Sequence, residues 1–248
     1  MVGGPAWQQG QALLADLDPG AVDLGLHLDL TEHPLTTAAM GLRALLARAY
    51  TGQLDRTAIR REIAAQLDAF EQALGRPPDY VDGHQHVHQL PGLRDDLIAA
   101  LQQRSGQHRP WLRHTGAPRR AVGMAAHGGW RSTLKPRVIQ ALGANGLALA
   151  AARAGFKQNH GLLGVYEFSD QATPYTARLQ AWLDDCRQAD LLMCHPSLEP
   201  IAGDPVGSAR QTEYALLSSA GFGATLRAQA VVLAPMSRIL CGPYDLAH

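Results

Sequence analysis

The chain has little cysteine, little lysine and no excess of charge of either sign. Of its 248 residues only three are cysteine (Cys186, Cys194 and Cys241), and none belongs to a Cys-x-x-Cys pair. This odd, scattered set argues against a disulfide framework and a zinc ribbon, and we expect a reducing, cytoplasmic location. Lys+Arg and Asp+Glu both number 22. The totals therefore predict no basic surface for nucleic acid.

Long apolar runs are also absent. No window reaches the roughly 18 uninterrupted apolar residues of a membrane span. Residues 1–17 lack the basic start and apolar run of a signal peptide. Hydrophobic residues make up 46% of the chain and charged residues 18%, which predicts a compact folded protein. We expect a single domain over residues 1–248.

Short apolar strands alternate with longer amphipathic helices. The clearest helix is Asp55–Leu74, whose apolar residues recur at spacings of three and four between an Asp N-cap and a Gly stop. Further helices are expected at Pro5–Leu17, Gly92–Gln103, Pro136–Ala154, Tyr175–Ala189 and Ala209–Ala220. Strands are expected at Val22–Leu28, Tyr80–Gly83, Trp111–His114, Leu162–Phe168, Ala189–Cys194 and Ser237–Gly242. This alternation is typical of parallel β/α architecture, and the length fits a β/α barrel.

Three histidines lie at the ends of predicted strands or directly after them, namely His27, His84 and His195. In parallel β/α folds the loops after the strands converge on one mouth, so these side chains are candidates for one site. Imidazole binds divalent metals and transfers protons near neutral pH. Two ligands and an acid would form a hydrolytic metal site. For His27 alone a hydrogen-bonded loop residue is the better interpretation, and for His195 alone the two interpretations are equal.

The segment Asp79–Gly92 holds His84, His86 and His88 directly after Asp82. If this segment stays extended, all three rings share a face with Asp82. We favour a turn after Gly83, in which only His84 reaches a metal. Asp82 and one later histidine would then orient it.

Polar residues near the other strand ends have two interpretations each. Arg113 either holds a polar or anionic substrate group or forms a surface ion pair. Asp29, Thr31 and Glu32, which follow His27, either line a pocket or cap the next turn.

Several of these segments resemble the YdjC-like carbohydrate deacetylases, which include the chito-oligosaccharide and hopanoid-associated deacetylases. The matching pieces are DLGLHLDLTEHPL, RPPDYVDGHQHVHQLPGL, LLMCHPS and, more weakly, ARQTEYALLSS. The resemblance implies a distorted (β/α) barrel and metal-dependent removal of the acetyl group from an N-acetylated sugar. It implies that His27 and His84 are metal ligands and that His195 donates a proton to the leaving amine. The family metal is usually magnesium, although two imidazoles also suit zinc.

The chain departs from the family at its start. Members open with a strand ending in ADDFG, whose aspartates supply the third metal ligand and the base. Residues 5–17 match a helix that comes after this strand. We therefore expect the N-terminal strand to be missing here and the activity to be impaired. An unpaired strand at Val22–Leu28 would also predict a homodimer or poor solubility.

Two rival interpretations stay open. Amidohydrolase barrels also use a His-x-His pair, together with a metal-bridging lysine, but Lys135 and Lys157 end no convincing strand. The other rival is a non-catalytic sugar-binding or assembly protein on a degenerate deacetylase scaffold. The sequence leaves open which acetylated sugar, which metal and which oligomeric state apply.

Overall fold

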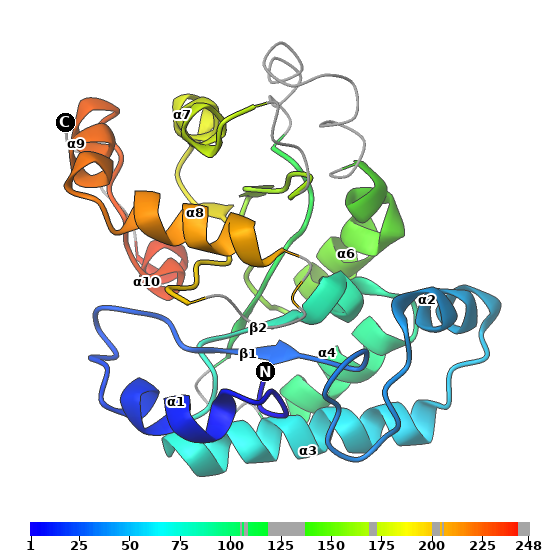
Figure 1. The fold of residues 1–248 in the computed structure, drawn as a ribbon. Coiled ribbons are helices and arrows are strands. Elements are labelled where there is room, and N and C mark those ends of the chain that lie inside the picture. Colours follow the sequence, from blue (N-terminus) through cyan, green and yellow to red (C-terminus); the bar gives the residue numbers. More distant parts are fainter. Residues whose placement is uncertain are drawn as a thin grey trace. The chain divides into compact units, whose positions relative to one another are not determined.

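The computed structural model describes residues 1–104, 106, 109–118, 137–168, 173–199, 204 and 206–242. The chain, drawn in Figure 1, divides into two compact units. Unit 1 comprises Met1–Thr115, Ala141–Asn159 and Ala234–His248, and unit 2 comprises Gly116–Gln140 and His160–Leu233.

Unit 1 is built on a parallel sheet. Its strands are β1 (Gly25–Leu28), β2 (Tyr80–Gly83) and β3 (Trp111–Leu112), in that order. Helix α3 (Arg56–Leu74) connects the first two strands, and α4 (Leu93–Arg104) lies between the second and the third. The predicted α/β class with parallel strands is confirmed.

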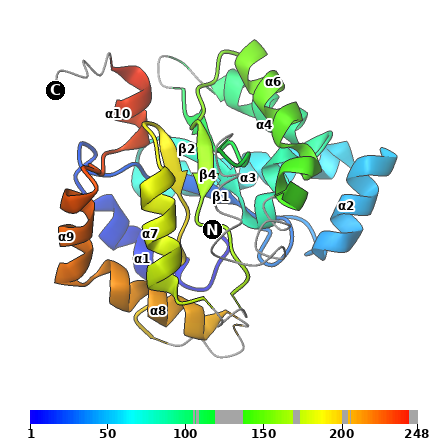
Figure 2. The ribbon, with the colours of Figure 1, turned by 90° about the horizontal axis from the view of Figure 1, so that it is seen from above.

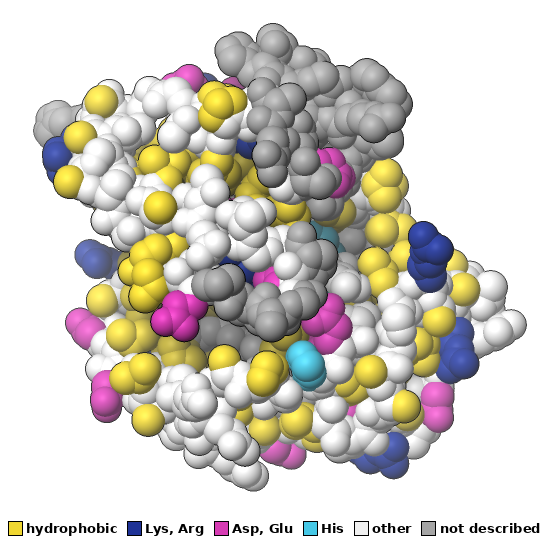
Figure 3. Space-filling view, viewed as in Figure 1, with side chains coloured by type: hydrophobic (Ala, Val, Ile, Leu, Met, Phe, Trp, Pro, Cys, Tyr) yellow, Lys and Arg dark blue, Asp and Glu magenta, His cyan; other side chains and the backbone are white. Residues whose placement is uncertain are grey.

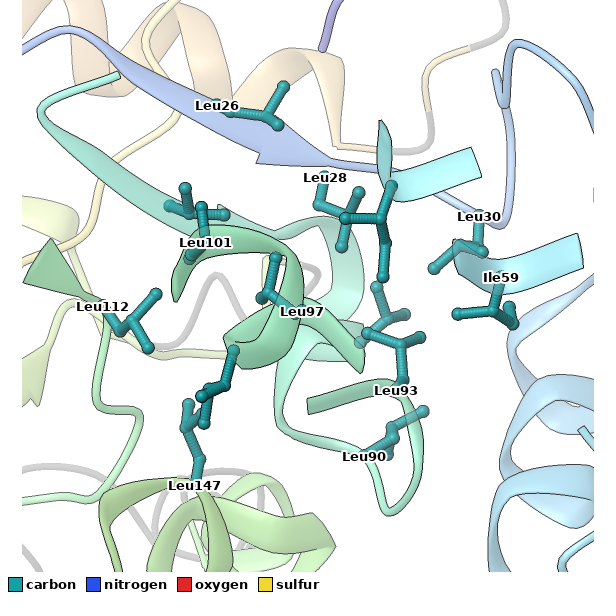
Figure 4. Packing of buried hydrophobic residues seen from close by; sticks show 14 of the residues in the cluster. Leu26, Leu28, Leu30, Ile59, Leu90, Leu93, Leu97, Leu101, Leu112 and Leu147 are labelled. Carbon is teal, nitrogen blue, oxygen red and sulfur yellow. The ribbon is translucent and has the colours of Figure 1, made fainter. Parts of the chain in front are cut away.

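The core of unit 1 lies between this sheet and its helices. Burial alternates along β1, so Leu26 and Leu28 face the core while His27 points to the other side. Figure 4 shows these leucines together with those of α4 and with Leu147 of α6 (Asn145–Arg153). Each fully buried leucine contributes about 1.5–3 kcal/mol, so the packed leucines fix the strand positions.

Helix α3 forms as the sequence predicts. The Asp55 side chain accepts a hydrogen bond from the Ala58 N–H at 3.0 Å, and Gly75 ends the helix at a φ of 66°. Ile59, Ile63 and Leu67 form its buried stripe. Figures 1 and 2 show α3 running beside β1, and α1 (Trp7–Ala15) packs on α3.

Unit 2 contains a second parallel pair, β4 (Gly161–Leu163) and β5 (Asp190–Leu192). Helix α7 (Tyr175–Asp185) connects them, and α8 (Gly207–Leu217) follows. Its core is aromatic, with Tyr166, Tyr175 and Trp182 in mutual ring contact.

The structure corrects several predicted elements. Residues 237–242, predicted as a strand, belong mainly to helix α10 (Met236–Cys241), which starts directly after Pro235. The strand predicted at Leu162–Phe168 ends at Leu163, because Gly164 has a φ of 85° and lies against the backbone of Met193. The other predicted strands are also shorter, apart from β2.

The predicted helices change as well. The described part of the predicted helix Pro136–Ala154 is broken at Gly143, whose φ is 128°, and its first residue lies outside the described residues. Helix α7 stops at Asp185 and not at Ala189. Besides α10, the described residues form two helices that were not predicted, α2 (Leu42–Thr51) and α9 (Ala220–Ala228). Among the described residues, no helix is both long enough and apolar enough to cross a bilayer.

Candidate active site

The sheet of unit 1 places three polar side chains in one row. His27 of β1 lies opposite Asp82 of β2 in the parallel register. Val81 pairs with Leu112, and the Arg113 N–H donates to the Val81 carbonyl at 3.2 Å, so Arg113 continues the row. Each of these residues directly follows a buried apolar residue of its strand. Neighbours in register share a face, which brings an imidazole, a carboxylate and a guanidinium together.

Asp82 is the centre of this row. Its Oδ1 lies 2.6 Å from His27 Nδ1, and its Oδ2 lies 2.5 Å from Nη1 of Arg113. Burial alone would raise the pKa of Asp82, but Arg113 and His27 outweigh it and hold the pKa well below its usual value. The carboxylate therefore stays ionised, fixes the Nδ1–H tautomer of His27 and leaves Nε2 facing His84.

The structure brings His27 and His84 together. His27 Nε2 lies 3.4 Å from His84 Nδ1, and the rings meet edge to face at 5.5 Å between centroids. On the far side of the His84 ring, Glu32 Oε1 lies 3.0 Å from Nε2. This is an ion-pair distance, but the pair lacks the geometry of a hydrogen bond. The four side chains form a chain of alternating carboxylate and imidazole, Asp82–His27–His84–Glu32.

A sharp turn after β2 separates the three clustered histidines. Segment η1 (His84–Gln89) starts at Gly83, and Gln85 and His86 adopt φ values of 49° and 61°. Non-glycine residues rarely adopt this region, and such strain is commonest at functional sites. The turn that we favoured from the sequence is therefore present, and the extended alternative is wrong. The predicted support of His84 is also wrong, because Asp82 holds His27 and the two later histidines contact Arg113.

The other two histidines pack behind the row. His86 Nδ1 lies 3.2 Å from Nη2 of Arg113, and His88 Nε2 lies 2.9 Å from the Arg113 carbonyl oxygen. Burial, followed by the charge of Arg113, lowers the pKa of His88 to about 3 and that of His86 well below its usual value. Arg113 is itself buried, and its Nη2 also donates to the Gly83 carbonyl at 2.8 Å. It is therefore a buried partner of Asp82, and the surface ion pair considered from the sequence is not formed.

A capped loop carries Glu32 to His84. The Asp29 carboxylate accepts hydrogen bonds from the backbone N–H groups of Thr31, Glu32 and His33, the last at 2.6 Å. Burial raises the pKa of Asp29, but these hydrogen bonds lower it by more. Asp29 is thus the cap of this turn, one of the two roles that the sequence left open.

Sequence reasoning missed the buried support of this loop. Glu62 of α3 accepts backbone hydrogen bonds from Leu35, Thr36 and Thr37 at 2.6–3.0 Å. Gln66, one turn later, donates to Glu62 at 2.7 Å and accepts from the Asp29 N–H at 3.0 Å. Both side chains are buried. The sequence held one signal for this support: Glu62 and Gln66 are polar residues next to the apolar stripe of Ile59, Ile63 and Leu67 on α3.

The His27–His84 pair fits a divalent ion as two of its ligands. Two imidazole nitrogens bound to one tetrahedral zinc ion at about 2.0–2.1 Å lie about 3.3 Å apart. The observed separation is 3.4 Å, and each ring has a carboxylate beside its other nitrogen. This is the outer-shell arrangement of metal-binding histidines. Within the residues that the structure describes, no set of three or more His, Cys, Asp or Glu side chains is arranged to hold a metal ion.

His195 belongs to unit 2, three residues after β5. Its backbone N–H donates to the buried carboxylate of Glu213, which also accepts the Tyr166 hydroxyl at 2.7 Å. Its ring meets Phe168 edge to face at 5.4 Å. Sequence reasoning missed Glu213 as a support, although it lies in the weakly matching segment ARQTEYALLSS.

The amidohydrolase alternative needs a lysine that bridges two metal ions, and the chain offers Lys135 and Lys157. Lys157 donates a hydrogen bond to the Leu240 carbonyl at 2.7 Å, so it is tied to α10, and Lys135 lies outside the described residues. On the face shown in Figure 3, the Lys and Arg side chains are dispersed among neutral and acidic ones.

Comparisons with known proteins identify the family. A model of the YdjC-like protein family matches residues 1–228. The chain belongs to the YdjC-like family. Three curated relatives match shorter stretches. They are human carbohydrate deacetylase (36% identity over 33% of this chain and 30% of the relative), mouse carbohydrate deacetylase (48%, 25% and 19%) and chitooligosaccharide deacetylase of Yersinia enterocolitica (39%, 29% and 32%).

The aligned stretches thus span a third or less of these relatives' lengths. Among solved structures, a protein from Enterococcus faecalis V583, whose description proposes cellobiose-phosphate cleavage, matches with a TM-score of 0.65 and 17% identity. The match covers 95% of this YdjC-like chain and 84% of the other. At that identity the likeness shows the fold.

Proposed function

We propose that this YdjC-like protein removes the acetyl group from an N-acetylated sugar with the help of a divalent metal held by His27 and His84. The observation that carries the proposal is the 3.4 Å approach of the two ring nitrogens, flanked by Asp82 and Glu32. The names of two curated relatives, carbohydrate deacetylase and chitooligosaccharide deacetylase, also support the proposal. Magnesium follows from the family resemblance, and zinc suits two imidazoles.

The reaction adds water across the acetyl C–N bond and releases acetate and a free amine. A bound divalent ion supplies Lewis-acid polarisation of the acetyl carbonyl and lowers the pKa of water. Asp82 keeps the Nδ1 proton on His27, so the Nε2 lone pair is the one available to a ligand. Arg113 keeps Asp82 ionised. His195 donates the proton that the amine nitrogen needs when the C–N bond breaks.

The test measures release of acetate from N,N′-diacetylchitobiose with added Mg²⁺ or Zn²⁺. Variants His27→Ala and His84→Ala should lose metal binding by calorimetry and lose turnover by at least about 100-fold. His195→Ala should retain metal binding and lose turnover. His160→Ala removes an exposed imidazole of unit 2 and serves as the matched control.

Two outcomes would overturn the proposal. Unchanged turnover in any of the three variants would remove that residue from the scheme. Binding of the sugar without metal and without turnover would favour the rival, a sugar-binding protein on a deacetylase scaffold.

A further inference from the structure

Glu32 lies on the His84 ring opposite His27. Its Oε1 is 3.0 Å from His84 Nε2, while His84 Nδ1 faces His27 Nε2 at 3.4 Å. The two nitrogens of His84 therefore have different neighbours, a carboxylate on one side and an imidazole lone pair on the other. A carboxylate attracts an N–H and repels a lone pair, so Glu32 favours the tautomer with the proton on Nε2.

The neighbour on the other side favours the opposite tautomer. The Nδ1–H group of neutral His27 donates a hydrogen bond to Asp82, which leaves a lone pair on Nε2. A neutral His84 could donate an Nδ1 proton to that lone pair and close the pair with a direct hydrogen bond. In that state neither facing nitrogen offers a lone pair to a metal. Glu32 and His27 thus compete for the position of one proton on His84.

An ordinary surface ion pair is the simpler interpretation of Glu32, because 48% of its side chain is exposed and such pairs contribute about 0–1 kcal/mol. The loop around it argues for more. Its own backbone N–H is held by the Asp29 carboxylate, and the next turn of the loop is held by buried Glu62. The backbone that carries Glu32 is therefore fixed before any ligand binds, so little entropy opposes the contact.

We infer that Glu32 is a positioning residue that keeps the proton of His84 on Nε2 and so leaves the His84 Nδ1 lone pair open to a metal ion. The inference rests on the proposed function for its purpose. Its physical content is a tautomer preference, which exists in the metal-free protein.

The first experiment reads the tautomer directly. Long-range ¹H–¹⁵N spectra of the metal-free chain with ¹⁵N-labelled histidine are recorded near pH 8.5, about two units above the usual histidine pKa. His84→Ala identifies the His84 signals. We expect an Nε2–H pattern in the parent chain and a shift to Nδ1–H in Glu32→Ala. Glu32→Gln keeps a partially negative oxygen beside Nε2 without the full charge and should restore part of the parent pattern.

The second experiment measures affinity for Zn²⁺ by calorimetry. Glu32→Ala should weaken binding by about 10-fold, and Glu32→Gln by less. Glu71→Ala, which removes a carboxylate of α3 that lies 3.5 Å from Arg104 of α4, is the matched control and should leave both readouts unchanged.

The outcomes separate this inference from the proposed function. The parent tautomer in Glu32→Ala would overturn the role of Glu32, whatever the activity of the chain. A tautomer shift in a chain that neither binds metal nor releases acetate would support the role of Glu32 and overturn the proposed function.

Discussion

At the scale of single residues, the candidate site depends on the third residue of β1, the third residue of β2 and the residue directly after β3. GLH, YVD and WLR each end in a polar residue after one buried apolar residue, and the register places His27, Asp82 and Arg113 side by side. The sequence alone pointed to His27 and Asp82 as strand-end residues. It left Arg113 undecided, because the register of β2 with β3 and the burial of its guanidinium appear only in the folded chain.

Gly83 is required by the close packing of the turn that follows it. A Cβ added there would lie 2.8 Å from the His88 backbone nitrogen and 2.9 Å from His88 Nδ1. We expect Gly83→Ala to destabilise the protein by about 1–3 kcal/mol, as overpacking does, and to displace His84. Urea unfolding measures the loss.

A matched glycine on α1 provides the control for this substitution. Gly10 lies inside the helix with nothing within 4 Å of an added Cβ. Gly10→Ala should therefore stabilise the chain by about 0.5–1 kcal/mol. Equal effects of the two substitutions would contradict our account of the turn.

At the scale of elements, periodicity and caps predicted α3 with its N-cap Asp55 and its stop at Gly75. Strand β2 was also predicted with the observed bounds. The failure at α10 has a physical cause. A short apolar run such as that in SRILCG lacks the length to reveal its period, and Pro235 before it starts a helix.

Helix α3 has a second function as the anchor of the loop that follows β1. Glu62→Ala would leave the backbone N–H groups of residues 35–37 without their buried acceptor. We expect a loss of at least about 1–3 kcal/mol in the free energy of unfolding, together with faster amide hydrogen exchange in the loop.

The same substitution at Glu71, whose half-buried carboxylate accepts no backbone hydrogen bond from the described loop residues 35–37 and lies 3.5 Å from Arg104, provides the comparison. Glu71→Ala should stay within about 0.5 kcal/mol of the parent. Slow exchange at residues 35–37 in Glu62→Ala would show that Glu62 does not hold the loop.

At the scale of the whole molecule, family membership and the parallel α/β class are established, whereas several expectations stay predictions. These are a single domain, a homodimer, a cytoplasmic location and impaired activity. The sequence could not decide them, because they depend on assembly, compartment and ligands.

Stability should fall as the pH falls, for two successive reasons. An unfolded chain protonates His88 near pH 6.5, but the folded chain holds its pKa at about 3, so the folded state binds fewer protons between these values. The contribution of neutral His88 is complete above about pH 6.5 and is lost toward pH 3. Buried Asp82 and Glu62 have lowered pKa values, so their contributions are complete above about pH 4.5 and are lost below it.

Urea midpoints between pH 7.5 and pH 5 isolate the histidine part, because the carboxylates stay ionised there. We expect the midpoint to fall over this range in the parent chain and to fall less steeply in His88→Gln, which cannot titrate. An equal slope in the two chains would show that His88 is not held neutral by the fold.

The left-handed residues Gln85 and His86 also limit how this histidine motif can be transplanted. Copying the sequence HQHVH onto a flat hairpin would place all three imidazole rings on one face of the strand, because alternate residues of a strand share a face. In the native bend only His84 faces His27, while His88 is enclosed in the interior. An engineer who wishes to borrow the site must therefore carry over the kinked backbone and the neighbouring strand, and not the five letters alone.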